Sequence, residues 1–374
     1  MKALIAGAGI GGLTAAIALR RAGIDVEVYE RAPRLAEVGA GISLWANAIA
    51  CLSELGLADE ILRSSVAYDV AGLRTPDGAR VGSVSVEQLK RRFPVPIVVL
   101  HRAELMDVLH HAFGTASLHL GKALVAFRDD VGGVHAEFSD GSSARGDFLV
   151  GADGLHSHVR SAIHGDRPAR YAGCTAWRGV VTFTQARVEA TETWGQGNIF
   201  GQVPMSRGRV YWYATQNGPP GGKNTDEKAA LLGLFGKWHA PIPALLEAAD
   251  PASILRNDIY DRPPLRWWGR GHVTLLGDAA HPMTPYLGQG GCQAIEDALA
   301  LAQALSSGKT VEEALRAYEQ ERIPRSTMFV KRSKAVGRMA QAANPVLVAL
   351  RNAVLRRVPA RLQAAGVIGM LELG

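Results

Sequence analysis

The sequence predicts an α/β fold: a three-layer domain on a mostly parallel sheet, an inserted α+β domain on an antiparallel sheet, and a helical C-terminus. Three observations predict it. A glycine-rich turn separates a short apolar strand from a helix at the N-terminus. Two later apolar strands, at residues 148–151 and 273–276, end at an aspartate beside glycine, which is typical of the ligand-facing edge of a parallel sheet. Between them, residues 171–213 are extended and aromatic.

The N-terminal turn has the spacing of a dinucleotide-binding site. The apolar run at residues 2–6 leads into Gly7, Gly9 and Gly12, and a helix rich in alanine and leucine follows. Gly7 permits a tight turn, Gly9 lets a pyrophosphate approach the backbone, and Gly12 lets helix and strand pack closely. The helix N-terminus then directs its positive dipole end at the phosphates. The turn therefore predicts a Rossmann-like domain.

Glu30 stands at the end of the second strand, at the distance where an acid accepts hydrogen bonds from a ribose diol. Arg31 beside it is assigned to the same site. A secretory signal would also begin with Lys2 and an apolar run, but here glycines break the run and no cleavage site follows.

The next segments predict strands and small turns. Residues 66–86 predict a hairpin around Pro76-Asp77-Gly78, and residues 94–100 predict a strand before a helix that begins near Arg102. Arg102 is either a phosphate or ribose ligand or a cation on the helix surface. Gly39 and Gly41 indicate either a backbone that passes close to something flat or crowded, or an ordinary flexible loop.

Residues 118–122, 124–128 and 134–138 predict small antiparallel strands. The buried strand at 148–151 ends at Asp153-Gly154 and opens into a helix. The aromatic segment predicts a meandering antiparallel sheet, and residues 226–238 predict a helix.

Beyond Asp278 the sequence continues with His281, a glycine cluster at 288–291 and two helical segments at 292–306 and 311–336. His281 is either a general base or a structural histidine. The last segment, residues 346–371, alternates apolar residues with four arginines. This amphipathic pattern favours packing on the protein or on a dimer partner over contact with a membrane surface.

The composition excludes several classes. The chain has 374 residues, 47% of them hydrophobic, which is enough for two domains with their own cores. No stretch is apolar enough to span a bilayer. Three distant cysteines predict a reducing cytoplasm and no metal site. A net charge of +6 without basic runs between aromatics gives no indication of nucleic-acid binding.

Three motifs stand in order: the glycine turn with Glu30, the Asp153-Gly154 corner, and Gly277-Asp278 with the glycines that follow. Together they resemble the single-component FAD-dependent aromatic hydroxylases (para-hydroxybenzoate hydroxylase-like flavoprotein monooxygenases) over nearly the whole chain. The resemblance implies tight, non-covalent FAD, and NAD(P)H as a transient co-substrate without a fold of its own. It implies these cofactor-binding residues: Gly7, Gly9, Gly12, Glu30, Arg31, Arg102, Asp153, Gly154, Asp278, Gly288, Gly290 and Gly291.

Three parts of the chain are expected. The FAD-binding domain is discontinuous and takes residues 1–67, 101–168 and 265–320. Residues 68–100 and 169–264 form the substrate-binding domain, and residues 321–374 form the C-terminal helical segment.

Within the family, residues 277–297 and 171–179 are most similar to the urate hydroxylase and zeaxanthin epoxidase branch. The urate-site tyrosine matches Tyr211, but the arginine that engages urate aligns with Ile199. An isoleucine cannot supply a bidentate grip on a polar purine. A more apolar aromatic or polyene substrate is therefore favoured.

The resemblance implies hydroxylation or epoxidation with NAD(P)H and O2 through a flavin 4a-hydroperoxide. Tyr211 and Pro285 are the expected catalytic residues, Tyr211 by orienting or deprotonating a substrate hydroxyl and Pro285 by lining the flavin ring. Strand alternation puts Tyr211 and Tyr213 on one face, which is expected to face the substrate. The expected substrate pocket consists of Trp177, Ile199, Tyr211 and Tyr213, although Trp177 and Arg178 point to opposite faces and at most one faces the pocket.

Two other functions stay open: a related flavoenzyme such as a halogenase or polyprenyl reductase, and a flavin-binding protein without turnover. The sequence leaves open the choice between NADH and NADPH, and between a monomer and a homodimer.

Overall fold

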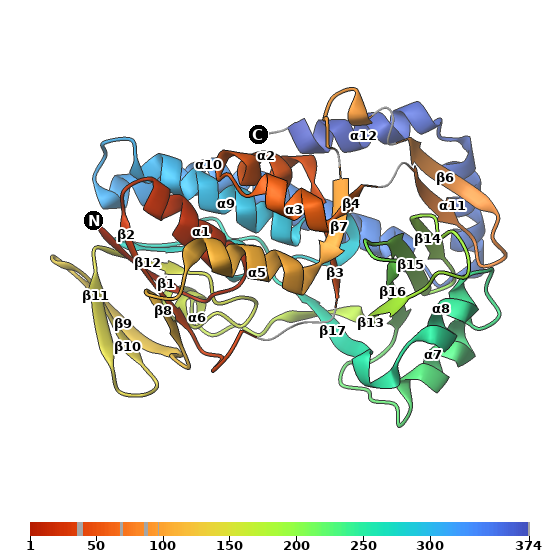
Figure 1. The fold of residues 1–374 in the computed structure, drawn as a ribbon, viewed down its shortest axis with the longest axis horizontal. Coiled ribbons are helices and arrows are strands. Elements are labelled where there is room, and N and C mark those ends of the chain that lie inside the picture. The colour runs from red at the N-terminus through yellow and green to blue at the C-terminus, as the bar shows by residue number, and fades with distance from the viewer. Residues whose placement is uncertain (36–39, 68–69, 86–88, 96, 373–374) are drawn as a thin grey trace.

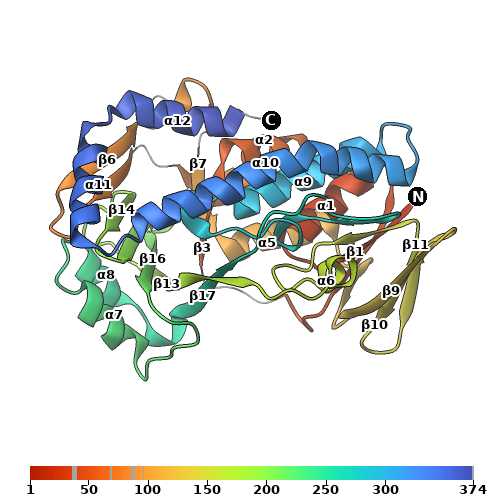
Figure 2. The same cartoon turned by 180° about the vertical axis from the view of Figure 1, so that it is seen from behind.

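The computed structural model describes residues 1–35, 40–67, 70–85, 89–95 and 97–372 (Figure 1). Gly39 and the last residue of the expected 66–86 hairpin lie outside the described residues. A parallel sheet and an antiparallel sheet lie toward opposite ends of the long axis, and long helices run across both (Figures 1 and 2). The predicted fold class is confirmed.

The first sheet has five parallel strands in the order β18-β12-β1-β2-β8. Its strands are β1 (Lys2–Ala6), β2 (Asp25–Glu30), β8 (Leu118–Leu120), β12 (Phe148–Gly151) and β18 (Val273–Leu275). The three adjacent strands β18, β12 and β1 are almost fully buried, as strands covered on both faces must be. This order places the carboxyl ends of β1, β12 and β18, and so the three sequence motifs, next to one another.

The expectation for residues 118–122 is wrong in one respect. β8 is not part of a small antiparallel sheet but pairs parallel with β2, from Val28 opposite Leu118 to Glu30 opposite Leu120. Three residues are too few for a period-two pattern to indicate a partner, so this pairing could not be read from the sequence.

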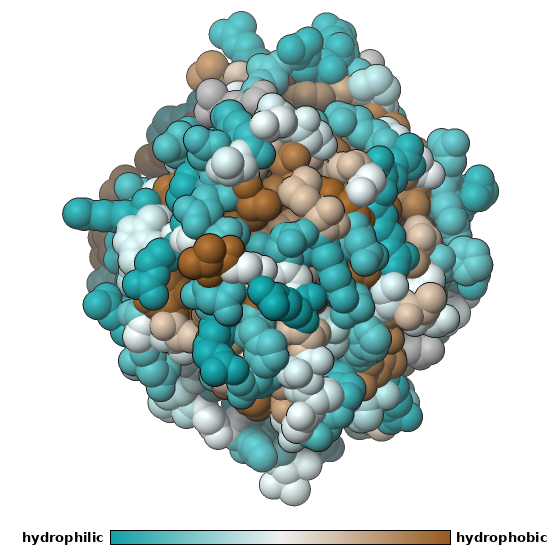
Figure 3. Space-filling model, turned by 90° about the vertical axis from the view of Figure 1, so that its left-hand side faces the viewer, coloured by the Kyte–Doolittle hydropathy of each residue, from teal (hydrophilic) through white to brown (hydrophobic). Residues whose placement is uncertain are grey.

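Helices and a small sheet complete the three layers. On one side lie α1 (Ile10–Arg21), α5 (Arg102–Phe113), α9 (Gly290–Leu305) and α10 (Val311–Ala340), with α1 packed between α9 and α5. On the other lie α6 (His158–His164) and the antiparallel strands β9 (Leu124–Asp130), β10 (Gly133–Phe138) and β11 (Ser143–Gly146). Figure 3 views the molecule from the end where the small sheet lies; this side is mostly hydrophilic with scattered apolar side chains.

A third sheet joins the two main parts. It has the order β3-β7-β4, with β3 (Gly41–Trp45), β7 (Ile97–His101) and β4 (Val66–Ala67) antiparallel. The helices α2 (Ala46–Glu54) and α3 (Ala58–Ser64) follow β3.

The second main sheet has seven strands in the order β17-β13-β16-β15-β14-β5-β6, antiparallel except for the β14–β5 pair. The strands are β5 (Val70–Arg74), β6 (Arg80–Ser85), β13 (Arg170–Thr182), β14 (Thr191–Trp194), β15 (Asn198–Pro204), β16 (Arg209–Asn217) and β17 (Leu255–Asp261). One face is covered by α7 (Glu227–Phe235) and α8 (Ile242–Ala248), which bury Trp212 and Phe200. The opposite face carries Tyr211, which packs with Ala40 and Val99 from the region of the third sheet.

The remaining elements are the short 3-10 turns η1 (Pro251–Ser253), η2 (Gly277–Ala279) and η3 (Pro285–Leu287), and two C-terminal helices. These helices, α11 (Pro345–Arg357) and α12 (Ala360–Glu372), pack against β6. Among the described residues, no helix is both long and apolar enough to cross a membrane.

Candidate active site

The glycine turn is crowded at two of its glycines and open at the third. Gly7 has φ +109°, and a Cβ there would lie 2.4 Å from the Ala152 carbonyl oxygen. A Cβ on Gly12 would lie 1.9 Å from the Gly7 carbonyl oxygen, so helix and turn touch directly. A Cβ on Gly9 would meet nothing within 4 Å, and α1 begins at Gly9 without a side-chain cap. The turn therefore leaves free N–H groups facing open space, as a phosphate site requires.

Glu30 is fixed beside this turn. One carboxylate oxygen accepts a hydrogen bond from the Ala8 amide (2.8 Å) and the other accepts one from the Ala32 amide (2.9 Å). A carboxylate has further lone pairs for a ribose hydroxyl. The neighbouring Arg31 is exposed.

Asp153 stands at the neighbouring strand end and has one satisfied oxygen. Its Oδ2 accepts from the His158 amide at the start of α6 (2.7 Å), while its Oδ1 is buried without a partner. Gly154 has φ +80° and open space around it. The corner is therefore structural on one side and available to a ligand on the other.

The turn that carries Asp278 is held from two sides. Asp297 accepts from the Gly277 amide (3.0 Å) and pairs with His281 (2.6 Å). Arg160 donates to the carbonyl oxygens of Ala279 and Ala280 (both 2.9 Å). Buried polar contacts of this kind fix the orientation of a binding residue.

His281 is therefore a structural residue rather than a base in the substrate pocket. Its side chain is 2% exposed and its Nε2 is bound to Asp297. The alternative of a structural histidine agrees with this geometry.

Asp278 and Arg102 border a space inside the protein. Both side chains are exposed, yet burial raises the pKa of Asp278 and lowers the pKa of Arg102. The nearby His281 and Arg102 lower the pKa of Asp278 in part, and Asp278 in turn favours the charged form of Arg102. Arg102 therefore lies within electrostatic reach of Asp278, which favours a shared site over an isolated cation on the outer helix surface.

The glycine cluster forms the N-terminus of α9. Gly288 has φ +61°, in the left-handed region that favours glycine, and α9 begins at Gly290 without a side-chain cap. Pro285 is exposed, and the nearby Trp45 Nε1 is buried without a partner. An uncapped helix end next to an unpartnered donor is suited to a group with negative charge.

The Tyr211 face of the second sheet carries a continuous polar row. The strand register aligns Arg178, Tyr213, Gly201 and Glu192 across four neighbouring strands. A Cβ on Gly201 would lie 2.0 Å from the Tyr213 ring, so Gly201 lets this ring lie flat across its strand. The Tyr213 hydroxyl reaches Glu192 (2.8 Å), which also accepts from the Trp194 indole (2.5 Å).

Burial raises the pKa of Glu192, and its two neutral donors lower it only in part. Arg178 and Glu192 are half-buried residues that sequence reasoning did not assign to the site. The strand register that pairs Arg178 with Tyr213 would have placed Arg178 on this face, but the sequence does not give that register. No sequence signal marks Glu192 as a residue of this face.

Tyr211 lies beneath β3. A Cβ on Gly41 would lie 2.5 Å from the Tyr211 ring, so the crowded neighbour expected at Gly41 is this tyrosine. Arg178 donates a hydrogen bond to the Tyr211 phenol. Burial raises the pKa of Tyr211 more than Arg178 and Arg102 lower it. A base needs a lowered pKa, so this direction favours the phenol as a hydrogen-bond donor over the alternative that Tyr211 deprotonates a substrate hydroxyl.

Trp177 does not belong to the pocket, which corrects the expectation. It lies on the opposite face, in the core formed with α7 and α8, and its Nε1 donates to Glu227 (2.7 Å). Ile199 is on the Tyr211 face, next to Trp194 and Tyr286. The polar row thus has an apolar neighbour at the position where the urate-site arginine aligns.

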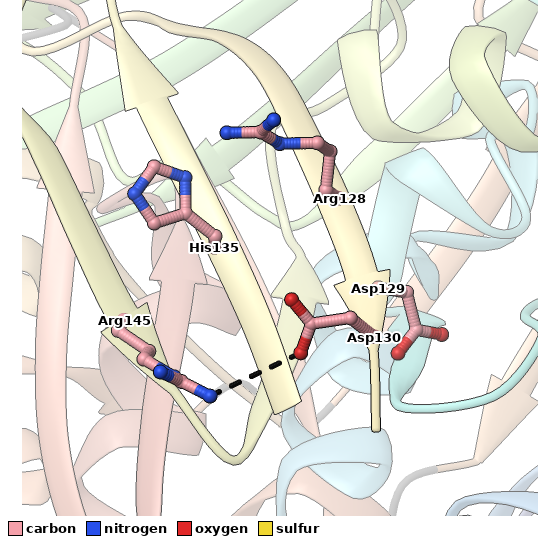
Figure 4. A pocket seen from close by; sticks show the side chains of 5 residues that line it. All are labelled: Arg128, Asp129, Asp130, His135 and Arg145. Atoms are coloured by element: carbon pink, nitrogen blue, oxygen red, sulfur yellow. Dashed lines mark ion pairs between the residues drawn. The ribbon is translucent and has the colours of Figure 1, made fainter. Parts of the chain in front are cut away.

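A separate hollow lies on the small sheet formed by β9, β10 and β11, away from the glycine turn and the Tyr211 face. Arg128, Asp129, Asp130, His135 and Arg145 line it, and the strands β9, β10 and β11 supply them (Figure 4). Asp130 faces Arg145 (4.0 Å) and Asp129 is bound to His272 (2.8 Å). Both carboxylates of the hollow therefore already have a basic partner. We assign no function to this surface. Among the described residues, no cluster of metal-ligating side chains occurs.

The class of protein follows from this arrangement and from comparison with known families. A family model described as an FAD binding domain matches residues 1–333, so the chain belongs to that family. The open space at Gly9, the unpartnered Asp153 oxygen and the interior position of Asp278 fit a bound dinucleotide.

Several similar proteins are monooxygenases or hydroxylases by name. The chain is 42% identical over 359 residues to the aurachin C monooxygenase/isomerase of Stigmatella aurantiaca, which covers 95% of this chain and 94% of that protein. It is 37% identical over 347 residues to the FAD-dependent urate hydroxylase of Klebsiella pneumoniae, covering 89% of each. The crystal structure of Klebsiella pneumoniae HpxO with FAD and uric acid has a TM-score of 0.94 at 33% identity, and covers 100% of this chain and 97% of that one.

The chain is therefore an FAD-dependent monooxygenase of the aromatic hydroxylase type, which acts by hydroxylation or epoxidation on an aromatic or conjugated substrate. The predicted resemblance and enzyme class are confirmed.

Proposed function

We propose that this enzyme uses NAD(P)H and O2 to oxidise a neutral, largely apolar aromatic or conjugated molecule, with FAD bound tightly but not covalently. The observation that carries the proposal is the Arg178–Tyr211 pair, which lies within electrostatic reach of Arg102 and through it of Asp278. The pocket and the cofactor cavity thus meet.

Three strand ends would hold the cofactor. The turn at Gly7, Gly9 and Gly12 with Glu30 and Arg31 would bind the adenosine half, and Arg102, Asp278 and the Asp153-Gly154 corner the central part. Pro285 and the glycines Gly288, Gly290 and Gly291 would line the ring. The chemistry that FAD supplies when bound is acceptance of a hydride from NAD(P)H and activation of O2 for transfer of one oxygen atom.

The residues of the chain orient and protect this reaction. Amides at the start of α9 stabilise negative charge on the ring, because preorganised donors act strongly in a dry site. The Tyr211 hydroxyl, with its phenol oxygen held by Arg178, donates a hydrogen bond to a substrate oxygen. The sheet with its buried aromatic side chains keeps water away from the reacting atoms. Exclusion of water prevents a reactive intermediate from being lost to a side reaction.

The pocket supports a neutral substrate over urate. Ile199 gives no bidentate contact, and Glu192 has no cationic partner among its hydrogen bonds. An anionic group near Glu192 would be unfavourable while that side chain is ionised. The names of the relatives, which include aurachin C, urate and zeaxanthin, indicate that the pocket and not the fold decides the substrate.

The direct test is a screen of aromatic and polyene compounds for substrate-stimulated NADH or NADPH oxidation and O2 uptake. We expect a product one oxygen atom heavier than the substrate. NAD(P)H oxidation without such a product for any compound would favour a reductase, a halogenase product would show the added halogen, and flavin binding without turnover would favour a sensor.

We place the enzyme in the cytoplasm, which its three free cysteines support.

Tyr211→Phe tests the role of the phenol. Removing one hydrogen bond that strengthens in the transition state costs about 1–3 kcal/mol, so we expect roughly a five- to 150-fold loss in the rate of oxygen transfer. The rate of flavin reduction by NAD(P)H should change little. Stopped-flow measurement of the two half-reactions separates them, and equal losses in both would remove Tyr211 from this role.

A further inference from the structure

The C-terminal helices expose an unusual amount of apolar surface. Six large hydrophobic side chains with at least 40% exposure fall between residues 339 and 362: Met339, Val346, Leu347, Leu350, Val354 and Leu362. Over the rest of the described chain, only four more reach 40% exposure, namely Met1, Val125, Val131 and Trp267. Four of the six lie on α11, which we call the α11 face: Val346, Leu347, Leu350 and Val354.

This face is fixed outward by the other side of the helix. Val348 and Arg351 are buried, and Arg351 donates to the carbonyl oxygens of Ala340 (3.0 Å) and Trp194 (3.4 Å). The helix begins at a cap in which Asn344 accepts from the amides of the first turn. Rotating α11 to hide its apolar stripe would break a buried arginine out of its contacts, which is strongly unfavourable.

The surroundings of the α11 face are basic. Lys331, Arg332, Arg338, Arg356, Arg357 and Arg361 are exposed. From residue 331 to residue 372 the only acid is Glu372, which is paired with Arg92. Asp77, from the β5–β6 turn, also lies near Arg356. The sequence on both sides of the stripe therefore carries exposed positive charge with little acidic compensation.

A second copy of the chain is a poor occupant for such a surface. In a two-fold interface the same patch meets itself, so a second copy brings the same exposed arginines and no exposed acid of the 331–371 stretch to pair with Arg356, Arg357 and Arg361. An anionic lipid surface instead satisfies both features, because the apolar stripe enters the boundary between headgroups and acyl chains while arginines contact lipid phosphates.

We propose that α11 docks this enzyme on an anionic lipid surface, with the α11 face inserted and the surrounding arginines at the headgroups. Arg351 of α11 contacts Trp194 of the substrate sheet, and it also contacts Ala340 at the end of α10, which packs with Ile199. Docking therefore brings the apolar end of the pocket close to the bilayer. This last consequence rests on the proposed function; the docking itself does not.

The test is flotation of the purified FAD-containing protein with vesicles of phosphatidylcholine alone or mixed with phosphatidylglycerol. We expect binding to the anionic vesicles, little binding to phosphatidylcholine, and release at high salt. Leu347→Ser with Leu350→Ser should lower the partition coefficient at least tenfold, because it removes two inserted apolar side chains. Arg356→Gln with Arg357→Gln should lower it about tenfold on anionic vesicles only.

Val131→Ser and Arg128→Gln are the matched controls, since both residues are exposed on the small sheet at the other end of the molecule. They should bind as the wild type does, and FAD content should be equal in all variants. Absence of binding to anionic vesicles, or equal binding by the α11 variants, overturns the proposal. A wild-type dimer in sedimentation equilibrium that the leucine variant dissociates, without vesicle binding, would assign the face to a second copy.

Discussion

Replacing Arg322 with methionine is expected to lower the stability of the protein by about 3–5 kcal/mol at neutral pH. The guanidinium is 4% exposed and binds Asp297 (2.7 Å), Glu296 (2.6 Å) and the Gln293 side chain (2.7 Å). Methionine fills similar space but leaves two buried carboxylates without this cation. The loss should appear as a decrease in Tm by several degrees in differential scanning calorimetry.

The pH dependence of this loss has a definite sign. Burial alone would raise the pKa of Asp297, but His281 and Arg322 outweigh it and lower the pKa to about 2. The stabilisation is therefore fully present above the ordinary value of 3.8 and is lost as the pH falls toward 2. In Arg322→Met the carboxyls can protonate at higher pH, so the difference from wild type should shrink on acidification.

A matched control comes from an exposed pair. Arg80 and Glu189 are 2.9 Å apart and about half exposed, so Arg80→Met should cost less than about 1 kcal/mol. Equal effects of the two substitutions would show that the buried network does not stabilise the fold. Adding Asp297→Asn to Arg322→Met should restore part of the stability, because Asp297 then carries no charge while Glu296 stays paired with the buried Arg325.

Sequence reasoning could assign three strand ends to one candidate cofactor site because its signals are local. Gly7, Asp153 and Asp278 each follow a buried apolar strand, and parallel strands end at a common edge. The order β18-β12-β1 then brings the three ends side by side, as expected. What the sequence could not supply is the set of long-range contacts that hold Asp278, such as those from Asp297 and Arg160, since neither has a periodic pattern or a fixed spacing to its partner.

The substrate pocket was less predictable, for a geometric reason. Alternation along a strand shows that Trp177 and Arg178 point to opposite faces, but it does not show which face a neighbouring helix covers. The packing of α7 and α8 decides this, and it assigns Trp177 to the core and Arg178 to the Tyr211 side. The protonation state of Tyr211 was equally inaccessible, because it depends on burial beneath Gly41 from a distant strand.

Gly9→Ala should separate FAD binding from folding. A Cβ at this position meets no protein atom within 4 Å, and Gly9 has φ −74°, which alanine adopts without strain. The apoprotein should therefore keep its stability within about 1 kcal/mol. In the FAD complex the methyl group would occupy the space through which the pyrophosphate approaches the α1 amides. Overpacking of this kind costs about 1–3 kcal/mol, which corresponds to roughly five- to 150-fold weaker binding.

Gly12→Ala in the same turn provides the contrast. Its Cβ would lie 1.9 Å from the Gly7 carbonyl oxygen, so the turn itself must move and the apoprotein loses stability. Titration of each apoprotein with FAD, together with its Tm without FAD, distinguishes the two effects. Undiminished FAD affinity in Gly9→Ala would place the pyrophosphate elsewhere, whereas a lowered apoprotein Tm would show that Gly9 has a structural role. Only weak binding by a stable apoprotein agrees with the open space at Gly9 being the phosphate site.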